Sequence, residues 1–160
     1  MPKYSIGNGI DTHRFCEGRP LILGGVTIPF DRGLAGHSDA DVLTHAIIDA
    51  LLGAATLDDI GTHFPNTNPK YKDISSMILL EQTLAMITSA GFQIGHIDAT
   101  IITQAPQMRP YILTIRQSLA DCLHLTLEDI SVKAKTTEGL GFIGRGEGMV
   151  ALATATLLPL

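Results

Sequence analysis

Apolar residues recur along the chain with two different periods, which predict a mixture of helices and strands. From residue 41 to residue 55 they keep to one side of a helix, with polar residues on the other side. A second helical pattern runs from about 74 to 90, with Asp73 as the expected N-cap and Gly91 as the stop. A third helix is expected after Pro110. Its apolar stripe consists of Ile112, Ile115, Leu119, Cys122 and Leu123.

Alternation with a period of two residues predicts strands before, between and after these helices. The expected strands are residues 4–6 ahead of Gly7 and Gly9, 21–23 and 26–28 on either side of a Gly24-Gly25 turn, 93–103, 130–134, and a last strand through 151–153. Neither a repeat nor a linker interrupts the series. The pattern therefore predicts one α+β domain over residues 1–160.

Composition agrees with one folded domain and excludes several classes of function. A chain of 160 residues with 45% hydrophobic and 17% charged residues can bury a core and is not of the disordered class. The absence of Trp and the net charge of −5 argue against a nucleic-acid partner. The most apolar stretch, 149–160, is shorter than the roughly 20 residues a membrane span needs. With no secretory pattern at the amino terminus, we expect no membrane partner and a cytoplasmic location.

Three residues could converge on a metal ion. Asp11 and His13 are two positions apart, so in an extended segment both side chains point to the same side, although an Asx-type turn would explain them as well. On the first predicted helix, Asp41, His45 and Asp49 form a column that a solvated polar face would ordinarily explain. However, residues 37–49 hold two His and three Asp, which favours a site. Asp11, His13 and His45 together suit Zn²⁺ with one position open for a substrate.

Two loops offer further polar groups, each with a structural alternative. The loop 57–69 carries an acid pair that capping and turn formation could explain. The glycine-rich loop 136–148 combines hydroxyl groups, free backbone N–H groups and Arg145, which suit phosphate oxygens. It matches neither the dinucleotide nor the P-loop pattern. Glycines needed for tight turns between strands explain it equally well.

Six motifs, in order and across the whole chain, closely resemble the 2-C-methyl-D-erythritol 2,4-cyclodiphosphate synthase family. They are Gly9 to Phe15, Gly24 to Pro29, His37 to His45, Asp49 to Ala55, Asp59 to Gly61, and Thr136 to Gly148. The resemblance implies a sheet with helices on one face, with the sheets of a homotrimer packed around its three-fold axis. It also implies conversion of 4-diphosphocytidyl-2-C-methyl-D-erythritol 2-phosphate to the 2,4-cyclodiphosphate and CMP by intramolecular phosphoryl transfer. Because the chain ends at Leu160, we expect the monofunctional form.

The resemblance also assigns roles to individual residues. It places zinc on Asp11, His13 and His45, and a second divalent ion, Mg²⁺ or Mn²⁺, on Glu138. His37 and Thr136 match positions that stabilise the transition state. Asp49 is expected either to orient a ligand imidazole or, like Asp59, to contact the methylerythritol hydroxyls. The substrate contacts implied are Ser38, Asp49, Asp59, Gly61, Phe64, Asn66, Asn68, Thr103, Ala105, Pro106, Gln107, Met108, Arg109, Lys135, Thr137, Phe142 and Arg145.

The same resemblance implies that the active site lies between neighbouring subunits. The cytidine would lie against residues 103–109 of one chain and the zinc ligands would come from another. Phe142 and Arg145 match residues near the trimer axis, where an isoprenoid diphosphate is bound in some members. Four positions depart from the family pattern and concern substrate affinity rather than the reaction: Asn66, Asn68, Gln107 and Lys135. Two other functions remain open, a zinc-dependent phosphohydrolase and an isoprenoid-diphosphate-binding trimer.

Overall fold

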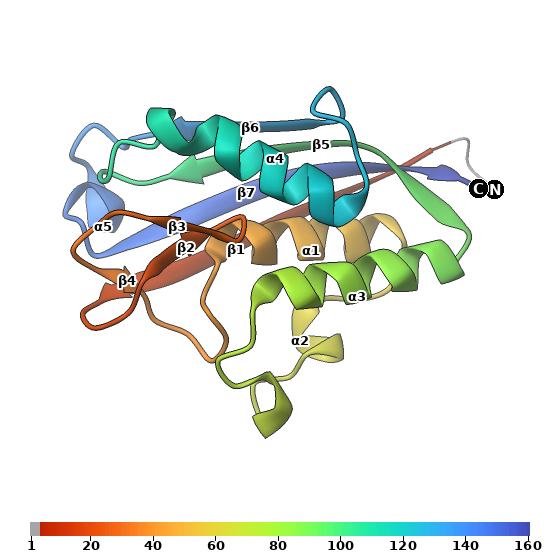
Figure 1. Ribbon diagram of the computed structural model, residues 1–160, viewed down its shortest axis with the longest axis horizontal. Helices are drawn as coiled ribbons and strands as arrows, with labels where there is room; N and C mark the ends of the chain where they lie inside the picture. The colour runs from red at the N-terminus through yellow and green to blue at the C-terminus, as the bar shows by residue number, and fades with distance from the viewer. Residues whose placement is uncertain (1–3) are drawn as a thin grey trace.

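The computed structural model describes residues 4–160 as a five-stranded mixed sheet with helices packed against it (Figure 1). The strands are β1 Ser5–Cys16, β2 Leu21–Leu23, β3 Val26–Ile28, β4 Gly33–Leu34, β5 Phe92–Ile102, β6 Ile130–Lys135 and β7 Gly148–Pro159. The helices are α1 Val42–Ala54, α2 Ile60–His63, α3 Ser76–Ser89, α4 Ile112–Leu123 and α5 Gly141–Gly144, with short 3-10 turns η1 Pro69–Tyr71 and η2 Arg109–Tyr111.

The sheet has the order β4-β1-β7-β5-β6, so the last strand of the chain lies in its middle. All its pairs are antiparallel except β5 with β6. The short strands β2 and β3 form a separate hairpin around Gly24 and Gly25, as the sequence predicts. Because β7 and β5 come between β1 and β6, the first and the penultimate strands lie far apart in the sheet.

Helices cover one face of the sheet (Figure 1). Helix α1 lies over β1 and β7, α4 lies over β6, and α3 contacts both α1 and α4. The opposite face presents apolar side chains to the surface: Ile10 on β1 is 63% exposed and its cross-strand partner Leu152 on β7 is 41% exposed. The α+β fold with helices on one face is therefore confirmed. None of the helices within residues 4–160 has the length and apolar character needed to cross a bilayer.

Strand β1 contacts helix α1 through backbone atoms. A Cβ atom added at Gly9 would lie 2.0 Å from the carbonyl oxygen of Ala46, and one at Gly7 would lie 2.1 Å from that of Ala50. Only glycine permits so close an approach. The strand predicted at residues 4–6 is confirmed, but it runs through both glycines and ends at Cys16. This contact fixes α1 directly above β1.

Helix α1 matches the predicted range but is buried on nearly every side. Only Asp49 and Gly53 are not buried, because α3 packs against the side that the pattern marks as polar. The predicted column of Asp41, His45 and Asp49 is thus not a solvated face. Helix α3 begins later than predicted, with Ser75 as its N-cap, because Asp73 has a left-handed backbone with φ of 56°.

Candidate metal centre and substrate pockets

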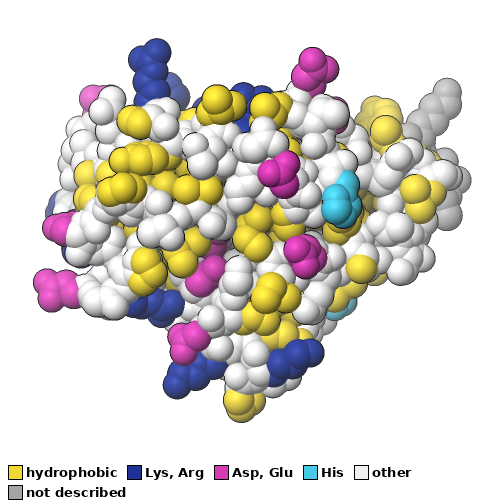
Figure 2. Space-filling view, viewed as in Figure 1, with side chains coloured by type: hydrophobic (Ala, Val, Ile, Leu, Met, Phe, Trp, Pro, Cys, Tyr) yellow, Lys and Arg dark blue, Asp and Glu magenta, His cyan; other side chains and the backbone are white. Residues whose placement is uncertain are grey.

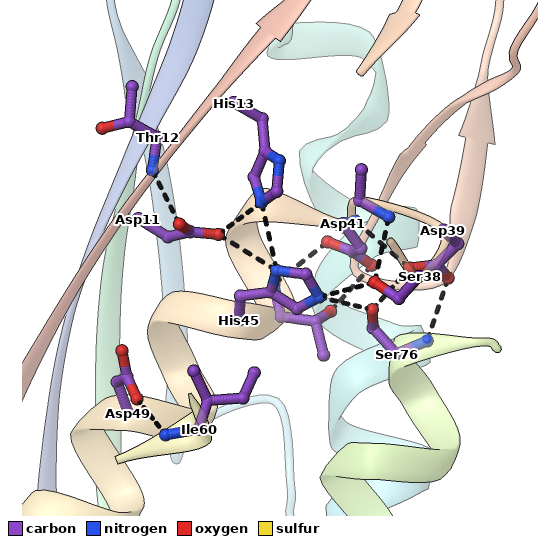
Figure 3. Close-up of polar contacts among 12 residues, drawn as sticks. Asp11, Thr12, His13, Ser38, Asp39, Asp41, His45, Asp49, Ile60 and Ser76 are labelled. Carbon is purple, nitrogen blue, oxygen red and sulfur yellow. Dashed lines mark hydrogen bonds and ion pairs between the residues drawn. The ribbon is translucent and has the colours of Figure 1, made fainter. Parts of the chain in front are cut away.

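Strand β1 and helix α1 bring Asp11, His13 and His45 together (Figure 3). Asp11 Oδ2 lies 2.8 Å from His13 Nε2 and 3.0 Å from His45 Nδ1. The two imidazole nitrogens are 3.2 Å apart. Four ligands in a tetrahedral zinc site, each about 2.05 Å from the metal, are separated by roughly 3.3 Å. One carboxylate and two imidazoles at this spacing fit Zn²⁺ with a fourth position open.

The ionisation of these residues reflects their mutual contacts. Burial opposes the charged form of Asp11, but the hydrogen bonds and charges of His13 and His45 outweigh it, so the pKa of Asp11 is lowered. Burial likewise opposes the charged form of His13, but its hydrogen bond with Asp11 and the charge of that carboxylate outweigh burial and raise its pKa. The cluster therefore combines an ionised carboxylate with an imidazole whose pKa is raised.

The outer nitrogens of both imidazoles have partners that hold the rings in place. His13 Nδ1 lies 2.6 Å from the carbonyl oxygen of Ala35. His45 Nε2 lies 2.8 Å from Ser76 Oγ and 3.1 Å from Ser38 Oγ. A carbonyl oxygen only accepts, so His13 Nδ1 carries a proton, and a metal ion on Nε2 would take the place of the hydrogen that Nε2 donates to Asp11. Both imidazoles thus direct one nitrogen at the same point.

Asp49 makes no hydrogen bond with either imidazole in the part of the chain that the structure describes. Its Oδ1 accepts a hydrogen bond of 2.8 Å from the backbone N–H of Ile60, at the start of α2 (Figure 3). Burial raises the pKa of Asp49, against the lowering effect of that hydrogen bond. Asp49 is expected from the resemblance either to orient a ligand imidazole or to contact the substrate. The hydroxyl groups of Ser38 and Ser76, not Asp49, are the hydrogen-bond partners of the His45 imidazole. The other oxygen of Asp49, Oδ2, accepts no hydrogen bond from the described residues.

A pocket of about 200 Å³ opens beside the three candidate ligands. It is lined by Asp11, His13, Gly36, His37, Ser38, His45, Ile60, Gly61, Phe64, Asn66, Tyr71 and Leu79. Most residues predicted to surround the methylerythritol diphosphate therefore lie together. Three do not line it, namely Asp49, Asp59 and Asn68, and their side chains accept hydrogen bonds from backbone N–H groups. Asp59 accepts from Thr62 N–H at 2.8 Å, and Asn68 accepts from Lys70 N–H at 3.0 Å.

A second pocket, of about 440 Å³, forms where β5 and β6 end. These strands are parallel and Ile102 pairs with Lys135, so the segments that follow them start side by side. The lining residues are Thr103, Gln104, Pro106, Gln107, Met108, Arg109, Ile112, Ala134, Lys135 and Thr136. The predicted nucleotide segment is thereby brought next to Thr136.

The two pockets do not meet within one chain. Strands β1 and β6 are separated by β7 and β5, and three strand spacings amount to about 14 Å. Glu138 is exposed and lies next to the second pocket. Its Oε1 accepts a hydrogen bond of 3.3 Å from Oγ1 of Thr136, which lines that pocket. The second metal ligand that the resemblance implies is thus remote from the zinc ligands of its own chain.

The glycine-rich loop borders a third, wider hollow. Phe142 on α5 lines it together with Phe15 and Arg32, and the Arg32 guanidinium lies 4.8 Å from the Phe15 ring centre. Arg145 does not line it but pairs at 3.1 Å with Glu147, which does. On the face seen in Figure 2, Lys and Arg side chains lie towards the edges and form no continuous basic patch. Charge on this face gives no support to nucleic-acid binding.

Three residues near the candidate ligands are not among the predicted site residues: Asp39, Tyr71 and Ser76. Tyr71 lines the first pocket. Ser76 is hydrogen-bonded to His45, and Asp39 is hydrogen-bonded to Ser76 (Figure 3). Ser76 is 31 residues from His45 in sequence and has the pattern of an ordinary helix N-terminus. Only the enrichment of Asp in residues 37–49 points to any of the three.

Comparison with known proteins gives one consistent result. The model of the YgbB family matches residues 4–158. A protein from Desulfatibacillum aliphaticivorans named 2-C-methyl-D-erythritol 2,4-cyclodiphosphate synthase is 57% identical over 152 residues, which are 95% of this chain and 98% of that protein. One of the same name from Moorella thermoacetica is 58% identical over 153 residues, 96% of this chain and 94% of that protein.

Solved structures agree. The fold matches the CDP complex of IspF from Plasmodium falciparum with a TM-score of 0.87 and 33% identity, over 99% of this chain and 98% of that one. It matches the bifunctional IspDF from Campylobacter jejuni with a TM-score of 0.95 and 44% identity. In that case the match covers 98% of this chain but 42% of the bifunctional protein.

Proposed function

The chain belongs to the YgbB family, whose relatives here are 2-C-methyl-D-erythritol 2,4-cyclodiphosphate synthases, and from this premise we propose which residues perform the reaction. The enzyme converts 4-diphosphocytidyl-2-C-methyl-D-erythritol 2-phosphate to the cyclodiphosphate. An oxygen of the 2-phosphate bonds to the β-phosphorus, while the bond from that phosphorus to the bridging oxygen breaks. CMP leaves with the bridging oxygen, and no water enters.

The cluster of Asp11, His13 and His45 beside the first pocket carries this proposal. These residues would hold Zn²⁺, which supplies a positive charge that polarises a phosphate oxygen. His37 and Ser38 line the pocket next to the ligands, where they would hold the phosphates in position. Because attacking and leaving groups belong to one molecule, positioning and neutralisation of charge supply most of the catalysis. No protein nucleophile is needed.

The second pocket would bind the cytidine. Residues 103–109 offer backbone groups and small side chains for the cytosine edge, and Lys135 adds a positive charge at its rim. Thr136 and Thr137 would bind the diphosphate, and Glu138 a second divalent ion, Mg²⁺ or Mn²⁺. Two cations explain how a chain with a net charge of −5 can bind a polyanion.

A homotrimer would join the two pockets into complete sites. The chain is proposed as one domain whose exposed sheet face, with Ile10 and Leu152, packs against its neighbours around the three-fold axis. Each zinc pocket would then face the cytidine pocket of the next subunit. Phe142 and Arg145 would lie near the axis, where an isoprenoid diphosphate could bind. The named relatives do not favour a phosphohydrolase as the alternative.

Incubation of the protein with the diphosphocytidyl substrate, Mg²⁺ and Zn²⁺ tests the function. Ring closure should release CMP and give a cyclic diphosphate, which phosphorus NMR distinguishes from linear products. Hydrolysis to linear phosphates would instead favour the phosphohydrolase. Asp11→Asn provides the matched control, because it removes one ligand oxygen with little change in shape and should abolish CMP release.

A further inference from the structure

Beyond the candidate ligands, His45 contacts two side chains in series. Its Nε2 lies 2.8 Å from Ser76 Oγ, and that hydroxyl is hydrogen-bonded to Asp39 Oδ1 (Figure 3). The backbone N–H of Ser76 donates to Asp39 Oδ2 at 3.0 Å. Ser76 is fully buried, so no water can replace a partner that its hydroxyl loses. Together they form a continuous chain of hydrogen bonds behind the imidazole.

The chemistry of the three groups fixes the direction of this chain. A carboxylate has no hydrogen to donate, so Asp39 accepts, and the Ser76 hydroxyl donates its single hydrogen to Asp39. Ser76 Oγ can then only accept from His45, which requires the hydrogen of that imidazole to be on Nε2. His45 Nδ1, which faces Asp11 and His13, is then the nitrogen whose lone pair would bind a metal ion in place of its hydrogen bond with Asp11.

Ser38, the second hydroxyl near His45 Nε2, does not impose the same direction. Its Oγ accepts a hydrogen bond of 3.2 Å from Ala40 N–H, but its own hydrogen has no fixed acceptor among the described contacts. It can therefore either accept from the imidazole or donate to it. The backbone carbonyl of Ala35 settles the matter for His13, whereas only Ser76 backed by Asp39 does so for His45.

We propose that Asp39 and Ser76 are positioning residues for the metal centre, which hold His45 with Nε2 protonated and Nδ1 presented to the zinc ion. This inference rests on the proposed assignment of zinc to Asp11, His13 and His45. Metal-bound histidines usually give their other N–H to a carboxylate, a carbonyl or water. Here a serine hydroxyl at the first turn of α3 is inserted between the imidazole and the carboxylate. It makes the start of α3 part of the metal site.

Zinc affinity of the purified protein, measured by competition with a chromophoric chelator, tests the proposal. Ser76→Ala should weaken zinc binding about 10- to 100-fold, the usual effect of removing a hydrogen-bond partner of a ligand. Asp39→Asn should weaken it at least as much, because the amide can donate to Ser76 Oγ and turn the hydroxyl hydrogen towards His45. Wild-type affinity in either variant would overturn the proposal.

Ser75→Ala is the matched control. Ser75 is exposed and caps the same helix by accepting from Met77 N–H at 3.3 Å, but it does not touch His45. Its loss should affect the stability of α3 and leave zinc affinity unchanged. If Ser75→Ala weakened zinc binding as much as Ser76→Ala does, helix fraying would be the cause and the proposal would be wrong.

A spectroscopic measurement separates positioning from a purely structural effect. In the zinc-loaded protein, the His45 Nε2–H proton should resonate downfield and exchange slowly with water, and in Ser76→Ala it should exchange faster or vanish. An unchanged resonance would contradict the proposal. Zinc binding that is insensitive to Asp11→Asn would remove the proposed zinc set itself. If zinc binding were lost in Asp11→Asn but unchanged in Ser76→Ala, only the positioning role of Asp39 and Ser76 would be contradicted.

Discussion

The two candidate pockets are built in opposite ways. In the zinc pocket, the polar groups of Asp11, His13 and His45 hold one another within 4.8 Å, on elements that belong to the core. In the cytidine pocket, exposed side chains such as Gln107 and Lys135 surround the ends of two parallel strands. A metal ion needs fixed ligand atoms, whereas a nucleotide can be held by a rim that a neighbouring subunit completes. The two halves should therefore fail independently.

Loss of a candidate zinc ligand should cause the largest fall in activity and should impair the zinc pocket but not the cytidine pocket. His45→Ala removes one imidazole, and a metal that contributes several kcal/mol to catalysis corresponds to about a 10³-fold loss of CMP release or more. Zinc content after gel filtration should fall with it. CMP binding, measured by calorimetry, should stay within about twofold, since His45 is not among the residues that line the cytidine pocket. Loss of CMP binding would show that the halves are coupled.

A substitution beneath the zinc pocket should act on its geometry. The Cβ of Gly9→Ala would overlap the carbonyl oxygen of Ala46, the residue after His45, and push α1 away from β1. We expect about 1–3 kcal/mol of lost stability and roughly a 10²-fold loss of activity from a misplacement of about 1 Å. Thermal unfolding and CMP release check this. Gly53→Ala, on the exposed side of α1, is the control and should not reduce the melting temperature.

A mixture of two inactive variants should recover activity if the halves come from different chains. His45→Ala disables the zinc pocket and Glu138→Gln the other half. Refolded together in equal amounts, the variants should yield about one quarter of the wild-type activity, because half of the copies supply each intact side of an interface. Each variant refolded alone should stay inactive. A mixture no more active than its components would place the whole site within one chain.

The smallest effect is expected at the rim of the cytidine pocket. Gln107→Lys adds a charge at an exposed position and should tighten CMP binding by about two- to fivefold, in line with exposed ion pairs of up to about 1 kcal/mol. High salt should remove the gain. Zinc affinity serves as the control and should not change. A gain that persists at high salt would mean that the introduced ammonium group makes a contact other than a screened charge interaction.

Local patterns were sufficient to predict the three long helices, most of the strands and the residues that such elements align, but not the short elements β4, α2 and α5. Asp11 and His13 alternate on one side of a strand, so their convergence follows from strand geometry. The range of α1 follows from its apolar period. The burial of His45 does not follow from a local pattern. It depends on α3, which lies against the other side of α1 and is distant in sequence.

The features that the sequence could not predict depend on contacts between residues that are distant in sequence. Asp73 and Ser75 can both cap a helix, and the choice of Ser75 goes with the Asp39 carboxylate, which accepts from Ser76 N–H. Separation of the two pockets depends on β7 pairing between β1 and β5, which no local period encodes. The resemblance to a family implied both pockets and their contribution by different chains, whereas the strand order that separates them is given by the structure.

Helix α1 links the metal ligands to the part of the molecule that unfolds last. Its burial between the sheet and α3 means that its amides exchange with solvent only when the whole domain opens. In zinc fingers the free energy of metal binding is the free energy of folding. Here the apolar core already keeps His45 above Asp11 and His13. Zinc bound to the proposed ligands would then stabilise, by mass action, a protein that is folded without it, and its loss would abolish the proposed activity but leave the fold intact.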